Sequence, residues 1–291
     1  MSRRVLFVLI IATLLLPTAA FADHAWGSYH WGRTANPFTL KAHDNVTSIW
    51  EAYLQEAADD WNPSAVLDVN VLWGQPLSSA RRCASAAGRI EVCNAKYGNN
   101  GWLGLAGISI SGNHITKAYT KVNDTYFNTA TYNTPAWRRL VMCQEIAHDF
   151  GLDHQDEAFD NANVGSCMDY TSDPDGGAGG GSPSDPSNEH PNAHDFDQLE
   201  TIYAHLDGSN TYSLVFNPTV EKLLRPPSME EILYDAGQWG TPIGFDAEGR
   251  PNVFVLRFQT DDLGAHEEVT HVLWAPFDPF PEREIDPARD Q

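Results

Sequence analysis

The sequence predicts an α+β fold, and three observations support this prediction. Residues 46–61 place large apolar side chains at helical spacing. Residues 66–73 alternate apolar and polar side chains, as a strand does. Residues 136–150 form a second helix-like stretch between clear capping residues. Helices and strands therefore both contribute to the core.

The first 22 residues have the three parts of a Sec-type signal peptide. Arg3 and Arg4 precede an apolar stretch at 5–16, and the segment ends on Ala20-Phe21-Ala22, a small-x-small cleavage site. A membrane anchor is the alternative, but about 12 apolar residues are fewer than the roughly 20 that cross a bilayer. We expect cleavage after Ala22 and a secreted, extracellular or periplasmic protein.

The charge of the chain narrows the choice of partners. The formal net charge is −21, and it becomes −23 when the segment carrying Arg3 and Arg4 is removed, since that segment holds no acidic residue. A strongly negative field repels phosphate backbones and anionic lipid. We therefore expect no nucleic-acid partner, no membrane partner after signal cleavage, and a monomer.

Further strands are predicted along the first half of the chain, at residues 89–93 and 103–111, with glycine and asparagine between them marking turns. His114 follows the turn-like pair Gly112-Asn113 and is interpreted as a surface residue. The next element is the helix at 136–150. Thr134 suits its N-cap, Pro135 its first turn, and Gly151 the left-handed position after its end.

This helix carries residues of the kind that hold a metal ion. Gln144 and His148 lie one helical turn apart, so both side chains can reach one ion. Glu145 lies beside them, and Gly151 lets the chain turn so that His154 can return as a third ligand. Three protein ligands, an open position and a nearby carboxylate are the requirements of a catalytic zinc site.

The stretch Gln144-Glu145-x-x-His148-x-x-Gly151-x-x-His154 resembles the metzincin signature H-E-x-x-H-x-x-G-x-x-H, with glutamine in place of the first histidine. Downstream, Cys167-Met168-Asp169-Tyr170 resembles the Met-turn of those zinc peptidases. The resemblance implies a twisted mixed sheet, an active-site helix, a Met-turn and a C-terminal helix. It covers residues 40–206 in layout, whereas its specific motifs occupy only 144–170.

The resemblance also implies a role for each matching residue. Gln144, His148 and His154 would hold Zn²⁺, and Glu145 would be the general base. Tyr170 would stabilise the oxyanion, and Met168 would form the apolar floor of the site.

Gln144 is the departure from the pattern, because a neutral amide oxygen binds zinc less tightly than imidazole does. Three outcomes stay open: a working site with an unusual ligand, a site that binds metal weakly and does little chemistry, and a scaffold without metal.

The four cysteines are even in number and lie in a chain predicted to be exported, which favours two disulfides among three possible connectivities. We expect Cys83 to pair with Cys93. We expect Cys143 to pair with Cys167, which would tie the metal-binding helix to the segment after it.

The last part of the sequence contains a loop, a helix and a β-rich extension. Residues 173–187 are rich in Gly, Ser and Pro and indicate a surface loop, and residues 193–206 predict a packing helix. Three histidines in this region are interpreted as surface or packing residues, with a role as auxiliary ligands as the alternative: His190, His194 and His205.

From residue 207 onward the composition changes, with a helix candidate at 229–236, strands at 239–245, 252–258 and 268–274, and an acidic tail after Pro276. The predicted organisation is a signal peptide (1–22), a metzincin-like domain (23–206) and a small β-rich extension (207–291). The predicted function is a secreted zinc-dependent endopeptidase that acts on a protein or peptide. The alternative is a catalytically inactive binding protein on the same scaffold.

Overall fold

The structure is a computed structural model that describes residues 24–74, 80–178, 184–212, 239–260 and 264–280. The predicted signal peptide at 1–22, the helix candidate at 229–236 and the end of the predicted tail lie outside these residues. Within them, no helix is both long enough and apolar enough to cross a membrane.

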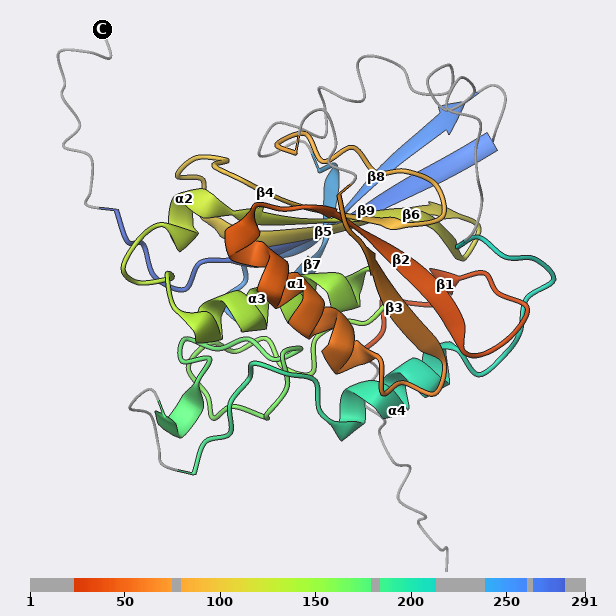
Figure 1. The fold of residues 1–291 in the computed structure, drawn as a ribbon. Helices are drawn as coiled ribbons and strands as arrows, with labels where there is room; N and C mark the ends of the chain where they lie inside the picture. Colours follow the sequence, from red (N-terminus) through yellow and green to blue (C-terminus); the bar gives the residue numbers. More distant parts are fainter. Residues whose placement is uncertain (1–23, 75–79, 179–183, 213–238, 261–263, 281–291) are drawn as a thin grey trace, which may run out of the picture.

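A single mixed sheet forms the centre of the molecule (Figure 1). Its path runs β3-β2-β4-β6-β5-β9-β8-β7, and the short β1 pairs with β6 beside that path. Neighbours from β3 to β6 are parallel, and those from β6 through β5 to β7 are antiparallel. The strands are β1 (His30–Trp31), β2 (Phe38–Asn45), β3 (Leu67–Leu72), β4 (Ile90–Ala95), β5 (Trp102–Ser111), β6 (His114–Asn123), β7 (Thr241–Phe245), β8 (Pro251–Thr260) and β9 (Gly264–Trp274).

The helices α1, α3 and α4 lie on one side of this sheet (Figure 1). Their bounds are α1 (Ser48–Trp61), α2 (Asp124–Phe127), α3 (Pro135–His148) and α4 (Ala193–Ile202), with a 3₁₀ turn at Gly176–Ala178. α1 packs against β3 and α3 and buries Trp50, Leu54 and Trp61. The α+β class predicted from the sequence, with a mixed sheet and a few helices, is confirmed.

The helix α3 begins where its capping residues predicted. The Thr134 hydroxyl accepts a hydrogen bond from the Trp137 amide at 3.3 Å, and Pro135 occupies the first turn. The helix ends at His148, two residues earlier than expected, and Gly151 follows with a φ of +93°. A Cβ at position 151 would overlap the carbonyl oxygen of Tyr29, so both conformation and space require glycine here.

The C-terminal strands continue the main sheet. β9 lies antiparallel along β5, with Ala106 opposite His271 and Gly104 opposite Leu273. Because side chains alternate along a strand, Val269 and Leu273 enter the main core, while Val272 packs with Trp102 in a second cluster. His271 lies between Val269 and Leu273 on the core side. The three strands predicted in the extension therefore add to the sheet that carries α3.

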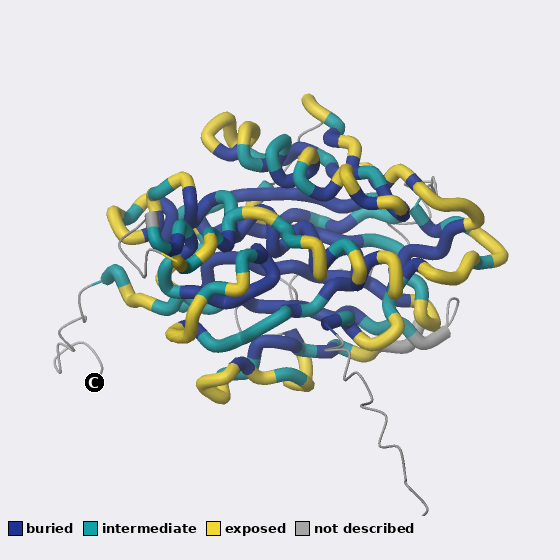
Figure 2. The backbone as a smooth tube through the Cα atoms, turned by 90° about the horizontal axis from the view of Figure 1, so that it is seen from below, coloured by how far each residue is buried: buried dark blue, intermediate teal, exposed yellow. Residues whose placement is uncertain are grey.

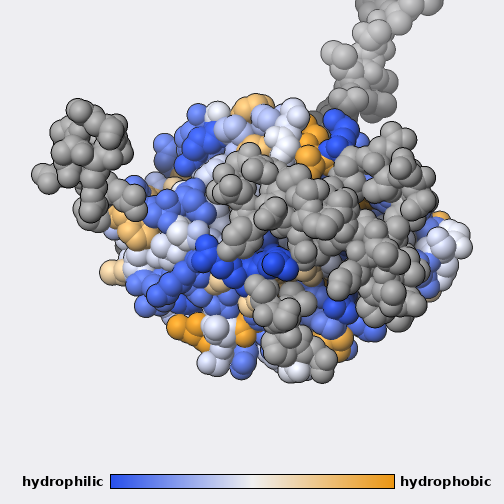
Figure 3. Space-filling view, turned by 90° about the horizontal axis from the view of Figure 1, so that it is seen from above, coloured by the Kyte–Doolittle hydropathy of each residue, from blue (hydrophilic) through white to orange (hydrophobic). Residues whose placement is uncertain are grey.

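The buried backbone runs through the middle of the molecule, and the exposed segments are concentrated in turns at its periphery (Figure 2). Among described residues on the face drawn in Figure 3, hydrophilic colours predominate and hydrophobic ones form small separate patches. Two disulfides link Cys83 to Cys93 and Cys143 to Cys167, the pairing expected from the sequence.

Three strands escaped the sequence analysis: β1, β2 and β6. β2 carries a readable signal, because Phe38, Leu40 and Ala42 are buried while Thr39 and Lys41 are exposed. β6 is harder to recognise, since it contains lysines and threonines yet is largely buried between β4 and β5.

Candidate metal centre

Three buried histidines meet in the core, two from the end of α3 and the turn after it and one from β9. His148 is the last residue of α3, His154 follows the turn at Gly151, and His271 lies on β9. One ring nitrogen from each lies within 4.8 Å of the other two, and all three residues are buried. The resemblance pointed to the first two. The third comes from a strand that the sequence analysis predicted without assigning any function to it.

In each of the three rings, one nitrogen makes a hydrogen bond and the other has no hydrogen-bond partner. His148 Nδ1 donates to the Leu152 carbonyl at 2.8 Å, and His154 Nδ1 lies 3.0 Å from a Glu157 carboxylate oxygen. His271 Nε2 lies 2.8 Å from the Tyr170 hydroxyl. The opposite nitrogens have no hydrogen-bond partner: His148 Nε2, His154 Nε2 and His271 Nδ1. For His148 and His154 the acceptor at Nδ1 fixes the tautomer and leaves Nε2 as the candidate ligand atom, as is typical of metal-ligating histidines; the Tyr170 hydroxyl can donate or accept, so it does not fix the tautomer of His271.

Gln144 carries a buried, unpartnered amide near the end of α3. It is fully buried one helical turn before His148, and neither its Oε1 nor its Nε2 has a hydrogen-bond partner. A buried amide without partners costs on the order of 1–3 kcal/mol. Imidazole nitrogens and an amide oxygen are donors that zinc accepts. The three histidines could therefore hold a metal ion, with the Gln144 amide as a further candidate donor.

Glu145 lies against β5 with both carboxylate oxygens buried and without hydrogen bonds. Its Oε2 is 3.6 Å from His271 Nδ1. Burial, and then the charge of Asp149, raise the pKa of the Glu145 carboxyl well above its ordinary value. The carboxylate fits there because position 104 is glycine, where a Cβ would overlap it. A nearby cation is what would allow this group to stay ionised.

Burial favours the neutral form of His148 and His271. Burial, followed by the neighbouring His154, lowers the pKa of His148 well below its ordinary value. Burial and the nearby His148 do the same to the pKa of His271. Neutral rings keep the lone pairs that coordination requires.

Tyr170 and Met168 occupy the segment predicted as a Met-turn. Tyr170 is buried beside His154, with 4.4 Å between ring centroids, and burial raises the pKa of its hydroxyl well above the ordinary value. Besides His271, the hydroxyl contacts the side chain of Asn252 on β8 at 3.1 Å. Met168 is fully buried, and its carbonyl accepts from the amide of Gln155, the residue after His154.

The centre is closed to a peptide. Its side chains are nearly inaccessible, and the Trp26 ring stacks on His148 at 4.9 Å between centroids. The same N-terminal segment is held by a bond between His24 Nδ1 and the Asp153 carbonyl at 3.0 Å. β9 closes the other side through His271. A substrate can approach the metal ligands only if one of these segments moves.

Of the residues that the metzincin-like motif singled out, Glu145, His148, His154 and Tyr170 are linked by contacts around His271, whereas Gln144 is buried one helical turn before His148. The sequence analysis missed His271, although one signal was available: this histidine occupies a core-facing position between two apolar residues of a predicted strand. The pairing of β9 with β5, about 165 residues earlier in the chain, is not encoded locally. Nothing in the sequence therefore indicated which site His271 would join.

Comparison with known proteins gives little further information. No protein-family profile matches the chain, and no curated protein matches it. A solved structure titled "Structure of Myroilysin" is similar at a TM-score of 0.35 and 14% sequence identity, covering 62% of this chain and 84% of that one. At this level of similarity we assign nothing to the chain from the comparison.

Proposed function

We propose that this chain is a secreted zinc metallopeptidase whose site is held closed by its own C-terminal strand β9. The observation that carries the proposal is the group of buried, unpartnered ligand atoms on Gln144, His148 and His154 beside the unpartnered carboxylate of Glu145. The metzincin-like motif of the sequence supports the same reading. Its substrate class is proteins or peptides.

The chemistry follows from the groups that surround the metal position. Zinc, when bound, supplies a Lewis acid that activates water and polarises a carbonyl. Glu145 would act as the general base, accepting a proton from the attacking water and returning it to the leaving amine. The Tyr170 hydroxyl donates a hydrogen bond to the oxygen on which negative charge develops.

The C-terminal strands explain why this machinery is closed. A peptide that adds to a sheet does so as an extended strand along a free edge. β9 already occupies the edge of β5 that borders Glu145. His271 then fills the side of the centre that a substrate would approach, and it holds the Tyr170 hydroxyl together with Asn252. Hydrolysis therefore requires that β8 and β9 leave.

A second candidate function is a non-catalytic protein in which the metal only stabilises the fold. The observation in its favour is that Gln144 and His271 bring the number of available protein ligands to four. Closed four-ligand sets are typical of structural zinc sites, whereas catalytic sites keep a position open.

The test uses the full chain with a specific protease site inserted between residues 213 and 238. Cutting it after folding leaves β7–β9 bound only by non-covalent contacts, so dilution promotes their release. We expect the zinc-loaded uncut chain to be inactive on a peptide library, and the cut chain to gain activity as it is diluted. The uncut chain at each concentration is the control for the inserted sequence.

Glu145→Gln in the cut chain should abolish the activity while zinc stays bound. A cut, zinc-loaded chain that releases its C-terminal piece yet hydrolyses nothing at any dilution would overturn the peptidase proposal. That result would favour the non-catalytic candidate.

A further inference from the structure

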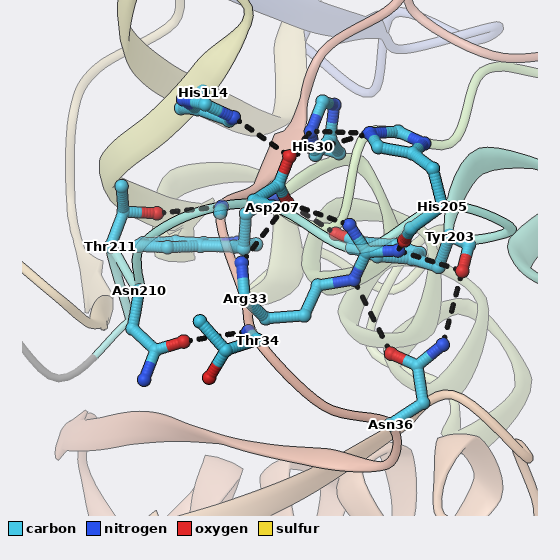
Figure 4. A network of polar contacts seen from close by, with 12 residues as sticks. His30, Arg33, Thr34, Asn36, His114, Tyr203, His205, Asp207, Asn210 and Thr211 are labelled. Carbon is cyan, nitrogen blue, oxygen red and sulfur yellow. Dashed lines mark hydrogen bonds and ion pairs between the residues drawn. The ribbon is translucent and has the colours of Figure 1, made fainter.

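We propose that His30, His114, His205 and Asp207 form a second metal site, specific for zinc or a similar divalent first-row ion. The cluster is separate from the centre at His148 and independent of the proposed function. Figure 4 shows the three rings and the carboxylate turned toward one another. The sequence analysis treated His114 and His205 as surface or packing residues, with an auxiliary ligand role for His205 only as the alternative.

The donor atoms have the spacing of a coordination shell. Asp207 Oδ1 lies 3.3 Å from His30 Nε2, 3.1 Å from His114 Nε2 and 3.5 Å from His205 Nε2. The Nε2 atoms of His205 and His30 are 3.1 Å apart. Ligands at 2.0–2.1 Å from a tetrahedral zinc ion are separated by about 3.3 Å. The ligand atoms of His30, His114 and Asp207 all lie within 4.8 Å of one another, and His205 Nε2 adds a fourth donor next to those of His30 and Asp207.

Hydrogen-bond accounting favours an ion over a purely internal network. His30 Nδ1 lies 2.7 Å from the Ser28 carbonyl, which only accepts, so this nitrogen carries a hydrogen. In the neutral ring, Nε2 is then a lone pair, and it faces both a carboxylate oxygen and a second ring nitrogen. A cation bound between His30 Nε2, His205 Nε2 and Asp207 Oδ1 would accept the lone pairs of all three atoms. The competing arrangement is a protonated His30 paired with Asp207.

Asp207 is held so that one oxygen stays available. Its Oδ2 accepts from the Arg33 guanidinium at 2.8 Å and from the Arg33 backbone amide at 3.1 Å. Its own amide donates to the Arg33 carbonyl at 2.8 Å. Oδ1 is left to the three imidazoles. Outer contacts of this kind orient the ligands of metal sites.

The ion would join three segments that are far apart in the sequence. His30 lies on β1, His114 begins β6, and His205 with Asp207 follows α4. Their link to one ion would tie the N-terminal segment to the end of the α4 region. The side chains of His205 and His114 are 55% and 35% exposed, so metal can enter and leave without unfolding. A chelator should therefore remove this ion before the buried one.

The experiment counts zinc in the full chain by native mass spectrometry after loading with zinc alone. We expect two ions per parent chain and one in His114→Ala and in the gentler His205→Gln. His190→Ala is the matched control, because His190 also pairs with an aspartate, Asp60, but contacts no second histidine in the described part of the chain. It should keep two ions.

The outcomes separate this proposal from the one on the buried centre. His148→Ala should lose the buried ion and keep the second, whereas a misfolded variant would lose both. If His114→Ala and His205→Gln bind as much zinc as His190→Ala, the cluster is only a protonated histidine paired with Asp207 and the proposal is wrong.

Discussion

Position 144 on α3 carries a neutral amide where the metzincin pattern has an imidazole, and His271 of β9 brings an imidazole to His148 and His154. The centre therefore has three histidines after all, two supplied by the signature and one by the C-terminal extension. Gln144 alone had suggested a weakened zinc site. With His271 included, the set of donors is strong enough to hold zinc.

Removing the Gln144 amide tests whether it contacts the metal. We expect Gln144→Ala to weaken zinc binding on the order of 10- to 100-fold, comparable to the loss of a contact that supports a ligand. Competition with a chromophoric chelator measures the change. Gln198→Ala, which removes a buried amide from α4, is the control and should leave the affinity unchanged. Equal affinities in both variants would mean that Gln144 does not touch the ion.

The Glu145 carboxylate occupies the space next to Gly104. A methyl group at position 104 should therefore displace either the carboxylate or the backbone of β5. We expect Gly104→Ala to lower the free energy of unfolding by about 1–3 kcal/mol, the usual cost of overpacking. Urea denaturation measures it. Gly208→Ala is the matched control, because an added Cβ at 208 meets nothing within 4 Å. A loss of the same size in both variants would argue against the close contact.

At the scale of elements, the capping residues and the spacing of apolar residues along the sequence predicted the helices α1 and α3. Thr134 and Pro135 gave the start of α3, and apolar spacing gave α1. The pairing of β9 with β5 is different, because it depends on contacts between residues far apart in sequence. The second histidine cluster escaped for the same reason: His30, His114 and Asp207 come together only when β1, β6 and the segment after α4 are in place.

The disulfide between Cys143 and Cys167 links α3 to the Met168 segment across 24 positions. Replacing both cysteines by alanine should cost about 3 kcal/mol of unfolding free energy and should also weaken zinc binding, because the two segments flank the metal. Unfolding curves and chelator competition give the two values. The control is the alanine double variant of Cys83 and Cys93, which should lose stability but keep its zinc affinity. Equal losses of affinity would contradict a local effect.

At the scale of the whole molecule, the extension completes both the sheet and the metal centre. The sequence predicted its three strands as a small addition to the main domain, and the structure shows them in the main sheet. The centre is consequently covered by segments from both ends of the described chain, since the rings of Trp26 and His271 both pack against His148. Opening the site requires the movement of a backbone segment, either the one that carries Trp26 or β9, and not of a single side chain.

The stability of the whole molecule should fall in mild acid, partly through His43 on β2. Burial, with the charges of Arg89 and Lys41, lowers the pKa of His43 to about 4, although Glu91 lies 4.0 Å from its Nδ1. The unfolded chain takes up this proton near pH 6.5, so stability is lost as pH falls from about 6.5 to 4. His43→Gln should show a shallower loss in urea titrations over that window. Parallel curves would contradict this assignment.

The most direct test of a metal centre closed by β9 is X-ray diffraction from zinc-loaded crystals of the full chain, measured at the zinc absorption edge. We predict an anomalous peak enclosed by His148, His154 and His271, with the Gln144 amide directed toward it. A zinc-loaded crystal with no peak at that position, or with His271 turned away from it, would contradict the claim that the C-terminal strand completes the centre.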